Sequence, residues 1–439
     1  MADGRLVVVS NRVPAAGGRV SVGGLVAALR PALEAVGGLW FGWGGSIGPA
    51  DAIERRREGR VEFVTCALTA DEEEGYYEGF CNRTLWPLMH GMPERAELRA
   101  GEYERWRAVN ARFAALLRPF LEPGDLVWVH DYHLMALGSE LRAAGWEGRA
   151  GYFHHIPVPE AALWNAIPQH LEIAAGFEAY DLVGLQTQRD VARLERYAPA
   201  AAGRMRAFPI GIDPQGMRAL AGQHPADAFE ARTGRQVLLG LDRLDYTKGI
   251  PDRLTAFERL IRRRPEVAAE ALLVQWSAPS REGIADYQAE RRRVDDAVGR
   301  LRALASPSPV EARHEVLPAE LVAAALRDAD VCLVTSRADG MNLVAKEFVA
   351  AQRPEAPGVL VLTDGCGAAE ELTDALIVPS GDIEALAEAI ERALEMPVEE
   401  RRQRWRSLAA TVEAGNVQEW CRGFLATLAG GEAPEVSEP

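Results

Sequence analysis

The strongest constraint on this chain is an alternation of short apolar runs and amphipathic segments that stops and begins again halfway along. Strand-like runs in the first half are RLVVVSNR, VEFVTCAL, DLVWVHDY, AGYFHHIP, LVGLQT and RAFPIGI. The segments GGLVAALRPALEAVG and NARFAALLRPFL between them have a helical pattern. Strands that alternate with helices predict a doubly wound, mostly parallel sheet.

The alternation begins again at QVLLGLDRL and continues through ALLVQWSAP, HEVLP, DVCLVTS and GVLVLTD, with helices expected around residues 251–264 and 286–304. The segment DPQGMRALAGQHPADAFEARTG between the two halves is poor in strand formers and is interpreted as the junction. A chain of 439 residues also exceeds what one core usually supports.

We therefore predict an α/β protein of two Rossmann-like, doubly wound domains that face each other across a cleft. The predicted domains are residues 1–215 and 216–430, and the last helix of the second is a candidate to pack back on the first. The polar tail, residues 431–439, is expected to be flexible.

Charge and cysteine content exclude several classes of protein. The formal net charge is −15, with 64 acidic and 49 basic residues, which argues against a general nucleic-acid or anionic-membrane surface. The five cysteines form no CxxC pair, so a disulfide framework or zinc module is not expected. The sequence shows neither a signal-peptide pattern nor an apolar run long enough for a membrane span. We predict a cytoplasmic protein.

Cationic loops predict a ligand that carries phosphate. In GLDRLDYTKGIPDRL, Arg243 and Lys248 follow an apolar strand and precede a helix, and Arg281 follows the next strand. Such strand-to-helix loops are where α/β proteins hold phosphate. Gly23 and Gly24 open an earlier helix, where backbone can approach a pyrophosphate closely. Each feature alone is commonplace, but two phosphate-bearing ligands would need about this much positive charge.

Other side chains suit the recognition of a sugar. Asp131 and His155 follow adjoining strands, where a carboxylate and an imidazole can bind sugar hydroxyls. Tyr77 and Trp86 are of the type that packs on sugar rings, although aromatic residues at this spacing belong more often to a core. Glu347 and Glu371 could each bind a ribose diol or equally cap local structure.

A metal site is not expected. The histidines His130, His133, His154 and His155 lie on strand ends, where alternate side chains point to opposite faces, and the sequence contains no HExxH motif. The sequence DAD at residues 328–330 is interpreted as a solvated helix end and not as a metal–nucleotide signature.

In these motifs the chain resembles the trehalose-6-phosphate synthase family, which are retaining glucosyltransferases of GT-B architecture. The resemblance runs in order through LVVVSNR, GGLWFGW, YY…LWP, HDYHL, HIPVP, PIGID, RLDYTKG, SR, DGMNLVAKE and GAAEEL, and covers nearly the whole chain. An ordered series of this kind is far more specific than any single motif.

The resemblance implies a donor site for UDP-glucose or another nucleotide-glucose. Gly23 and Gly24 match the loop over the pyrophosphate, Arg243 and Lys248 match the pair that holds the phosphates, and Glu347 matches the ribose ligand. The other implied donor residues are Asp339, Met341, Asn342, Leu343, Val344 and Glu371.

The resemblance also implies an acceptor site for glucose 6-phosphate. The matching residues are Arg12, Tyr77, Trp86, Asp131 and Arg281, with Arg12 and Arg281 toward the phosphate. His155 and Asp339 would lie at the transferred glucose, so the implied catalytic set is His155, Arg243, Lys248 and Asp339.

The implied activity is metal-independent transfer of glucose to glucose 6-phosphate, which forms α,α-trehalose 6-phosphate without a cofactor. Two alternatives remain at this point: a glucosylglycerol-phosphate synthase or related transferase, and an inactive family member that binds nucleotide-sugar. The sequence departs from the family where Ala338 replaces the arginine before Asp339 and Arg337 carries the charge instead. A homo-oligomer is compatible with the sequence but not indicated by it.

Overall fold

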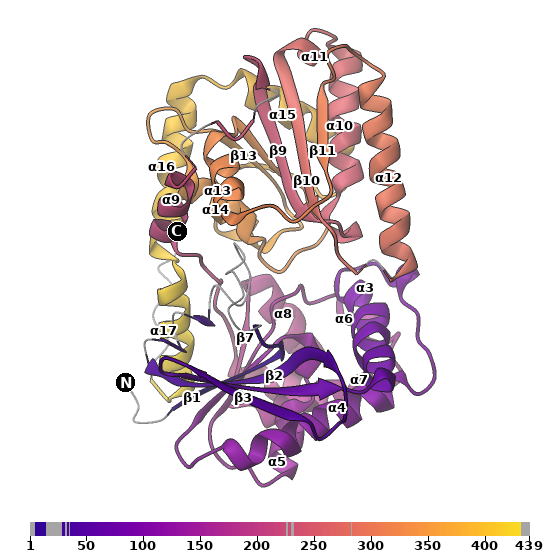
Figure 1. The fold of residues 1–439 in the computed structure, drawn as a ribbon, viewed down its shortest axis with the longest axis vertical. Coiled ribbons are helices and arrows are strands. Elements are labelled where there is room, and N and C mark those ends of the chain that lie inside the picture. Colours follow the sequence, from indigo (N-terminus) through magenta and orange to yellow (C-terminus); the bar gives the residue numbers. More distant parts are fainter. Residues whose placement is uncertain are drawn as a thin grey trace. The chain divides into compact units, whose positions relative to one another are not determined.

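The computed structural model describes residues 5–14, 29–30, 33–34, 36–224, 227–229, 232–281 and 283–431. These residues form two compact units, which Figure 1 shows in ribbon form. The first unit contains the described residues up to 210 together with 418–431, and the second contains 211–417 except for the gaps above. The division therefore lies at 210/211, where we predicted it at 215/216, and the chain returns to the first unit at 417/418. The last helix is the element that we named as a candidate for this return.

Three of the expectations from the sequence fall on residues outside the described ranges. These are the Gly23–Gly24 pair, most of the helix expected over 23–37, and the tail from 432 onward. In the described part of the chain, none of the helices combines the length and apolar character that crossing a membrane requires.

The first unit is built on an eight-stranded sheet with the order β3-β4-β2-β1-β5-β6-β7-β8. All neighbouring strands are parallel except β3, which runs antiparallel to β4 at the edge. The strands are β1 (Leu6–Arg12), β2 (Gly38–Ile47), β3 (Ile53–Glu58), β4 (Val61–Leu68), β5 (Leu126–His130), β6 (Ala150–Phe153), β7 (Leu182–Leu185) and β8 (Met205–Ala207).

The helices of this unit include a long π-helix, η1 (Glu73–Leu85), between two short α-helical segments. The α-helices are α2 (Ala70–Glu72), α3 (Trp86–Met89), α4 (Glu102–Leu117), α5 (Leu137–Ala143), α6 (Ala161–Trp164), α7 (His170–Gly176), α8 (Gln188–Tyr197) and α17 (Val417–Leu428). Short 3₁₀ turns are η2 (Pro93–Arg95), η3 (Arg118–Phe120), η4 (Tyr132–Leu134), η5 (Phe177–Ala179) and η6 (Pro199–Arg204). The helix η1 contains Tyr77, and π-helices are rare elements that are found frequently at functional sites.

Helix α17, the last helix in the described part of the chain, packs on the sheet of the first unit (Figure 1). Phe424 is fully buried and stacks on Trp128 of β5 at a centroid distance of 4.5 Å. A Cβ atom on Gly184 of β7 would lie 2.7 Å from the Phe424 ring, so glycine is needed there for α17 to approach. The chain end is therefore part of the first core.

The second unit is a six-stranded parallel sheet with the order β11-β10-β9-β12-β13-β14. Its strands are β9 (Gln236–Arg243), β10 (Ala271–Ala278), β11 (Val310–Arg313), β12 (Val331–Val334), β13 (Val359–Thr363) and β14 (Leu376–Val378). The order reverses between β9 and β12, and ligands of doubly wound sheets bind beyond the carboxyl ends of the strands at such a point.

Two layers of helices cover this sheet. In one layer α10, α12 and α15 pack together, and in the other α9, α13, α14 and α16 do so (Figure 1). The helices are α9 (Pro214–Gly222), α10 (Ile250–Arg263), α11 (Val267–Glu270), α12 (Ala285–Arg302), α13 (Ala319–Asp328), α14 (Leu343–Ala351), α15 (Ile383–Glu395) and α16 (Val398–Ala414), with short turns η8 (Tyr246–Lys248) and η9 (Gly367–Glu370).

The predicted fold class, two Rossmann-like α/β units, is confirmed for each unit taken by itself. One detail of the expectation is wrong, because the strand expected at HEVLP lies earlier, at β11. The segment interpreted as the junction begins just after the division at 210/211 and contains helix α9. The strand β2 was missed because its sequence GLWFGWGGSI contains glycines that depress strand propensity, although burial in a parallel sheet stabilises it.

Replacing Phe424 by alanine should destabilise the first unit by about 3–5 kcal/mol, because a buried aromatic ring is removed from a tightly packed interface. A lower urea midpoint of unfolding would report this loss. Arg422→Ala on the exposed side of the same helix is the control, and its unfolding free energy should change by less than about 0.5 kcal/mol. Equal midpoints for the two variants would contradict the packing described for α17.

Candidate active site

The cationic loop predicted from GLDRLDYTKGIPDRL has the expected form. Strand β9 ends at Arg243, the turn η8 ends at Lys248, and α10 begins at Ile250 with Pro251 in its first turn. Arg243 is exposed at the carboxyl end of the sheet, and Lys248 is largely buried. Both cations therefore lie between a strand end and a helix N-terminus, the arrangement that favours a bound phosphate.

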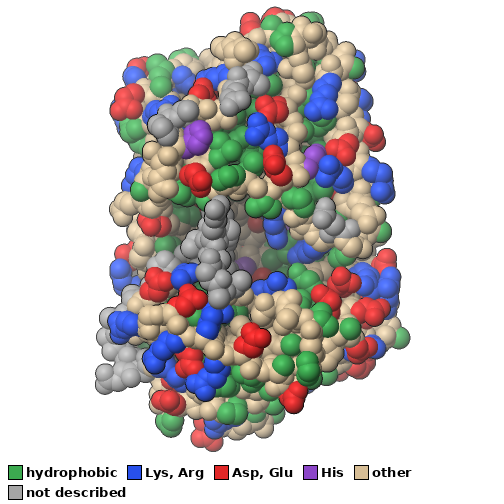
Figure 2. Space-filling model, in the orientation of Figure 1, with side chains coloured by type: hydrophobic (Ala, Val, Ile, Leu, Met, Phe, Trp, Pro, Cys, Tyr) green, Lys and Arg blue, Asp and Glu red, His purple; other side chains and the backbone are tan. Residues whose placement is uncertain are grey.

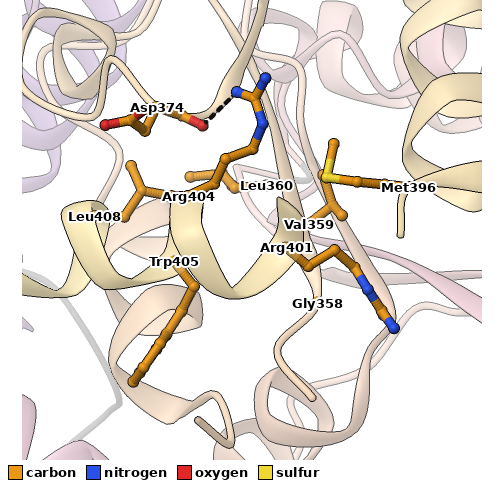
Figure 3. A pocket seen from close by; sticks show the side chains of 9 residues that line it. All are labelled: Gly358, Val359, Leu360, Asp374, Met396, Arg401, Arg404, Trp405 and Leu408. Carbon is orange, nitrogen blue, oxygen red and sulfur yellow. Dashed lines mark hydrogen bonds between the residues drawn. The ribbon is translucent and has the colours of Figure 1, made fainter. Parts of the chain in front are cut away.

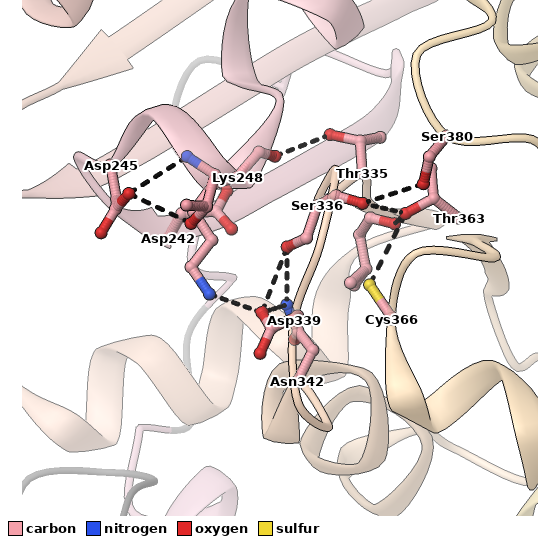
Figure 4. Close-up of polar contacts among 12 residues, drawn as sticks. Asp242, Asp245, Lys248, Thr335, Ser336, Asp339, Asn342, Thr363, Cys366 and Ser380 are labelled. Carbon is pink, nitrogen blue, oxygen red and sulfur yellow. Dashed lines mark hydrogen bonds and ion pairs between the residues drawn. The ribbon is translucent and has the colours of Figure 1, made fainter. Parts of the chain in front are cut away.

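Lys248 is held by the carboxylate of Asp339, which follows β12. Its Nζ lies 2.5 Å from Asp339 Oδ2 (Figure 4). The same oxygen accepts hydrogen bonds from Ser336 Oγ at 3.2 Å and Asn342 Nδ2 at 3.0 Å. Burial alone would lower the pKa of Lys248, but the Asp339 carboxylate outweighs it and raises that pKa above its usual value. Lys248 is therefore a permanent cation.

The backbone of Asp339 joins a third loop to this pair. Its N–H donates to Gly365 O at 3.0 Å, and its carbonyl accepts from Gly367 N at 3.0 Å. Both glycines follow β13. The loops after β9, β12 and β13 are thus connected around one carboxylate.

A second carboxylate, Asp245, is completely buried in the cationic loop. It accepts hydrogen bonds from the Thr247 backbone N–H and hydroxyl, both at 3.1 Å. Burial alone would raise the pKa of Asp245, but the positive charges of Arg281, Arg243 and Lys248 lower it below its usual value. Asp245 is the counter-charge shared by all three predicted phosphate ligands of the second unit.

The strands that carry these loops are fixed by a buried guanidinium. Arg253 of α10 has no exposed surface, and its Nη1 donates to Asp242 Oδ2 of β9 at 2.6 Å and to Gln275 Oε1 of β10 at 3.0 Å. Its Nε donates to Thr335 Oγ1, just after β12, at 2.9 Å. Arg253 passes over Gly240, where a Cβ would lie 2.2 Å from Nη1.

The two predicted diol ligands differ in their surroundings. Glu347 of α14 is only 3% exposed, and burial raises its pKa to about 7. Among the residues that the structure describes, none donates a hydrogen bond to its carboxylate. Glu371 instead forms an ion pair with the buried Lys346 at 2.6 Å. Glu347 therefore has unused acceptor capacity, whereas one oxygen of Glu371 already has a cation.

The remaining predicted donor residues lie at the start of α14. Met341 and Asn342 are buried in the preceding loop, and Leu343 and Val344 are half-buried in the first turn. Asn342 has a left-handed backbone, with φ of 72°, which turns the chain into the helix. Arg337, displaced from the position the family uses, forms a two-point ion pair with Asp252 of α10 at 2.8 and 2.9 Å.

In the first unit, Arg12 and Tyr77 both contact Trp43, a tryptophan that we did not predict as part of the site. The Arg12 guanidinium lies 4.3 Å from the centre of the Trp43 ring. Tyr77 contacts the same ring edge-on at 5.3 Å. Trp43 is fully buried in β2, so it holds both residues at the carboxyl end of the sheet.

Asp131 has a backbone that non-glycine residues rarely adopt, with φ of 75°. Its carboxylate accepts a hydrogen bond from the His155 backbone N–H at 3.2 Å, and its own N–H donates to Phe153 O at 2.8 Å. Strained backbone of this kind persists where surrounding contacts enforce it, as they often do at functional sites. Asp131 and His155 are brought together as the sequence predicted.

The ring of His155, however, is engaged on both nitrogens within its own unit. Its Nε2 lies 3.0 Å from His130 Nδ1, and its Nδ1 lies 3.4 Å from Gln186 Nε2. The Ile210 N–H donates to Gln186 Oε1 at 3.0 Å, so the amide must present its NH₂ to His155. His155 therefore carries its proton on Nε2 and donates to His130, and burial keeps both rings neutral by lowering their pKa values.

Trp86 lies deeper than an acceptor ligand on a surface would. It is 5% exposed, its ring lies 4.1 Å from His90, and it contacts Tyr132 at 5.8 Å. Trp86 therefore has the surroundings of a core residue, which is the alternative that its sequence context offered. A contact between Trp86 and a sugar stays a prediction.

Two further expectations concern metals and the DAD segment. Within the described ranges, no group of three or more His, Cys, Asp or Glu side chains is arranged to hold a metal ion. The interpretation of DAD as a solvated helix end is wrong for Asp328, which is 6% exposed. Its oxygens accept from Arg327, Arg353 and the Ala228 N–H, so it anchors the segment before β9.

Other surface features lie apart from these loops. Figure 3 shows a pocket at the amino end of β13, lined by Gly358–Leu360, Asp374, Met396 and residues of α16. The pocket therefore lies at the amino ends of the strands, whereas Asp339 lies at their carboxyl ends. Side chains of both signs are interspersed on the face shown in Figure 2.

Four side chains of evident importance were missed: Asp245, Trp43, His130 and Gln186. Asp245 and Trp43 lie inside the motifs RLDYTKG and GGLWFGW, and a carboxylate between two cations was a usable signal. Gln186 gave no signal, because its role depends on contacts with His155 and Ile210, which are distant in sequence.

The fold and these loops define a glycosyltransferase of the GT-B class, as the resemblance implied. The family model described as glycosyltransferase family 20 matches residues 8–194 and 199–430. The chain belongs to this family, and the resemblance to trehalose-6-phosphate synthases is confirmed.

Relatives of known name cover almost the whole chain. A trehalose-6-phosphate synthase of Sinorhizobium fredii is 39% identical in an alignment of 457 residues that covers 97% of this chain and 98% of the relative. The crystal structure of an α,α-trehalose-phosphate synthase (UDP-forming) from Burkholderia xenovorans in complex with glucose-6-phosphate is 36% identical, with a TM-score of 0.93 over 97% of this chain and 100% of that chain. A structure of the E. coli protein bound with UDP-2-fluoro glucose is 33% identical, with a TM-score of 0.92 over 98% and 100%.

Glu347 is buried and accepts no hydrogen bond from a described residue, so we expect it to lower the free energy of unfolding in a pH-dependent way. Its pKa rises from 4.5 to about 7 on folding, so the folded state loses stability as the pH rises from 4.5 through about 7. Above that range Glu347→Gln should be more stable than the unmodified protein by up to about 3 kcal/mol, and below it the two should match. The free energy of denaturant unfolding, measured for both proteins below pH 4.5 and above about pH 7, tests this prediction. A stability difference between the two proteins that does not depend on pH would contradict it.

Proposed function

We propose that the protein is a retaining glucosyltransferase that moves glucose from UDP-glucose to glucose 6-phosphate and forms α,α-trehalose 6-phosphate. The observation that carries the proposal is the cationic loop at the carboxyl end of the second sheet, in which Arg243 ends β9 and Lys248 lies just before the N-terminus of α10. Relatives that are trehalose-6-phosphate synthases, and whose structures contain glucose-6-phosphate or UDP-2-fluoro glucose, support the choice of substrates.

The leaving diphosphate is the group that these cations would stabilise. Negative charge builds on it as the bond to glucose breaks, and donors already in place lower the barrier without reorganising. Asp339 keeps Lys248 ordered and charged before the ligand arrives. Attack on the same face as the departing diphosphate retains configuration, and the diphosphate can accept the acceptor's proton.

Glu347 supplies the ribose contact in this proposal. Its buried carboxylate has acceptor sites that described residues leave unused, and the two hydroxyls of a ribose would supply the donors. The acceptor sugar is assigned to Arg12, Tyr77 and Asp131, which lie at strand ends and in η1, with Trp43 supporting the first two.

Turnover without added metal is part of the proposal. Two permanent cations, Arg243 and Lys248, supply the positive charge that a divalent ion supplies in other nucleotide-dependent enzymes.

The direct test is nucleotide release by the purified full-length chain with UDP-glucose and glucose 6-phosphate in the presence of a chelator. Release that depends on glucose 6-phosphate is expected. Release with glycerol 3-phosphate instead would move the function to a glucosylglycerol-phosphate synthase. Binding of UDP-glucose without release would indicate an inactive binding protein.

Lys248→Ala and Arg243→Ala should each lower kcat by about 10²–10³-fold, because each removes one preorganised charge from the transition state. Their circular dichroism spectra should match that of the unmodified protein. Arg259→Ala, which removes an exposed cation of α10, is the matched control and should keep full activity. Unchanged kcat in both loop variants would exclude the assigned role.

A further inference from the structure

Asp245 is assigned to no ligand, either by the sequence motifs or by the proposed mechanism. Its side chain has no exposed surface. Beyond its bonds to Thr247, it accepts a hydrogen bond from the Tyr287 hydroxyl at 3.2 Å and lies 3.5 Å from Arg281 Nη1. Tyr287 also accepts a hydrogen bond from Arg281 Nη1. Asp245 thus joins the loop after β9 to the loop after β10 and to helix α12.

Arg281 is held in an unusual conformation by these contacts. Its backbone φ is 46°, in the left-handed region that side-chain-bearing residues seldom adopt. Such a conformation needs external contacts to persist. The Arg281 carbonyl accepts a hydrogen bond from the Ile284 N–H at 2.9 Å, and Asp245 and Tyr287 hold the Arg281 guanidinium. The direction in which Arg281 presents its guanidinium therefore depends on the Asp245 carboxylate.

The same carboxylate acts on the donor-side cations. Arg243 and Lys248 both contribute to keeping Asp245 ionised, and the attraction works equally in the other direction. The Lys248 N–H also donates to the Asp245 carbonyl at 3.0 Å, which fixes the turn η8.

We propose that Asp245 is a positioning residue for two phosphate sites at once. Through its hydrogen bonds to Thr247 it sets the turn η8 and thus Lys248 for the donor diphosphate, and through Tyr287 and its own contact it sets Arg281 for the acceptor phosphate. This inference rests on the proposed function, because the two kinds of phosphate are the two substrates of that reaction. It predicts that a single neutral substitution impairs recognition of both substrates.

Asp245→Asn is the decisive variant, since it keeps the shape of the side chain and removes its charge. The Michaelis constants for UDP-glucose and for glucose 6-phosphate should both rise at least about tenfold, because a buried charge pair loses one partner. If Asp245 were only a background negative charge, its removal would strengthen phosphate binding, and both constants would fall. A change in one constant alone would also overturn the proposal.

Tyr287→Phe keeps the test open if Asp245→Asn fails to fold. It removes the hydroxyl between Arg281 and Asp245 and leaves every charge in place. The Michaelis constant for glucose 6-phosphate should rise while that for UDP-glucose stays unchanged. Unchanged values for both substrates would overturn the proposal.

Asp295→Asn on α12 is the matched control, because its carboxylate is 52% exposed and pairs with Arg291. Both of its Michaelis constants should equal those of the unmodified protein. Inactivity of the unmodified protein with these substrates would refute the proposed function itself, whereas an active unmodified protein with an unimpaired Asp245→Asn variant would refute only this inference.

Discussion

The buried hydrogen bonds of Arg253 are the interactions on which the carboxyl edge of the second sheet depends. Its guanidinium binds β9 through Asp242, β10 through Gln275 and the end of β12 through Thr335. Arg243, Arg281 and Asp339 follow these three strands in the same order. A buried charge of this kind stabilises little by itself, but removing it would leave its polar partners unsatisfied at the place where the strand ends must keep register. The buried hydrogen bonds of Arg253 thus determine where these strand ends place Arg243 and Arg281.

Carboxylates form ion pairs with cations of the site and hold them in place. Asp339 holds Lys248, Asp252 holds Arg337, and Asp245 balances the set from within the core. These pairs keep a concentration of positive charge stable in a chain whose net charge is −15. Glu347 is the contrasting case, since burial without a hydrogen-bond donor among the described residues costs stability that ligand binding can restore. Lys248 and Arg337 are therefore paired with carboxylates, whereas the Glu347 carboxylate receives no hydrogen bond from a described residue.

Much of the fold could be predicted because the chain alternates apolar strands with amphipathic helices. The strands β1, β4, β5, β9 and β13 follow from their apolar runs, whereas β2 and the π-helix η1 do not, since packing against neighbours overrides their local propensities. The cationic loops were found because their residues are adjacent in sequence. The burial of Asp245 and Asp328 and the inward hydrogen bonds of His155 were not, because partners far along the chain determine them.

We propose that this chain supplies, from its own side chains, the positive charge needed to transfer glucose from UDP-glucose to glucose 6-phosphate. Proton and phosphorus NMR of the product formed from these two substrates in excess chelator tests this proposal. A non-reducing α,α-linked disaccharide phosphate is expected, at a rate that added magnesium does not change. A reducing product, or formation that requires a divalent ion, would contradict it.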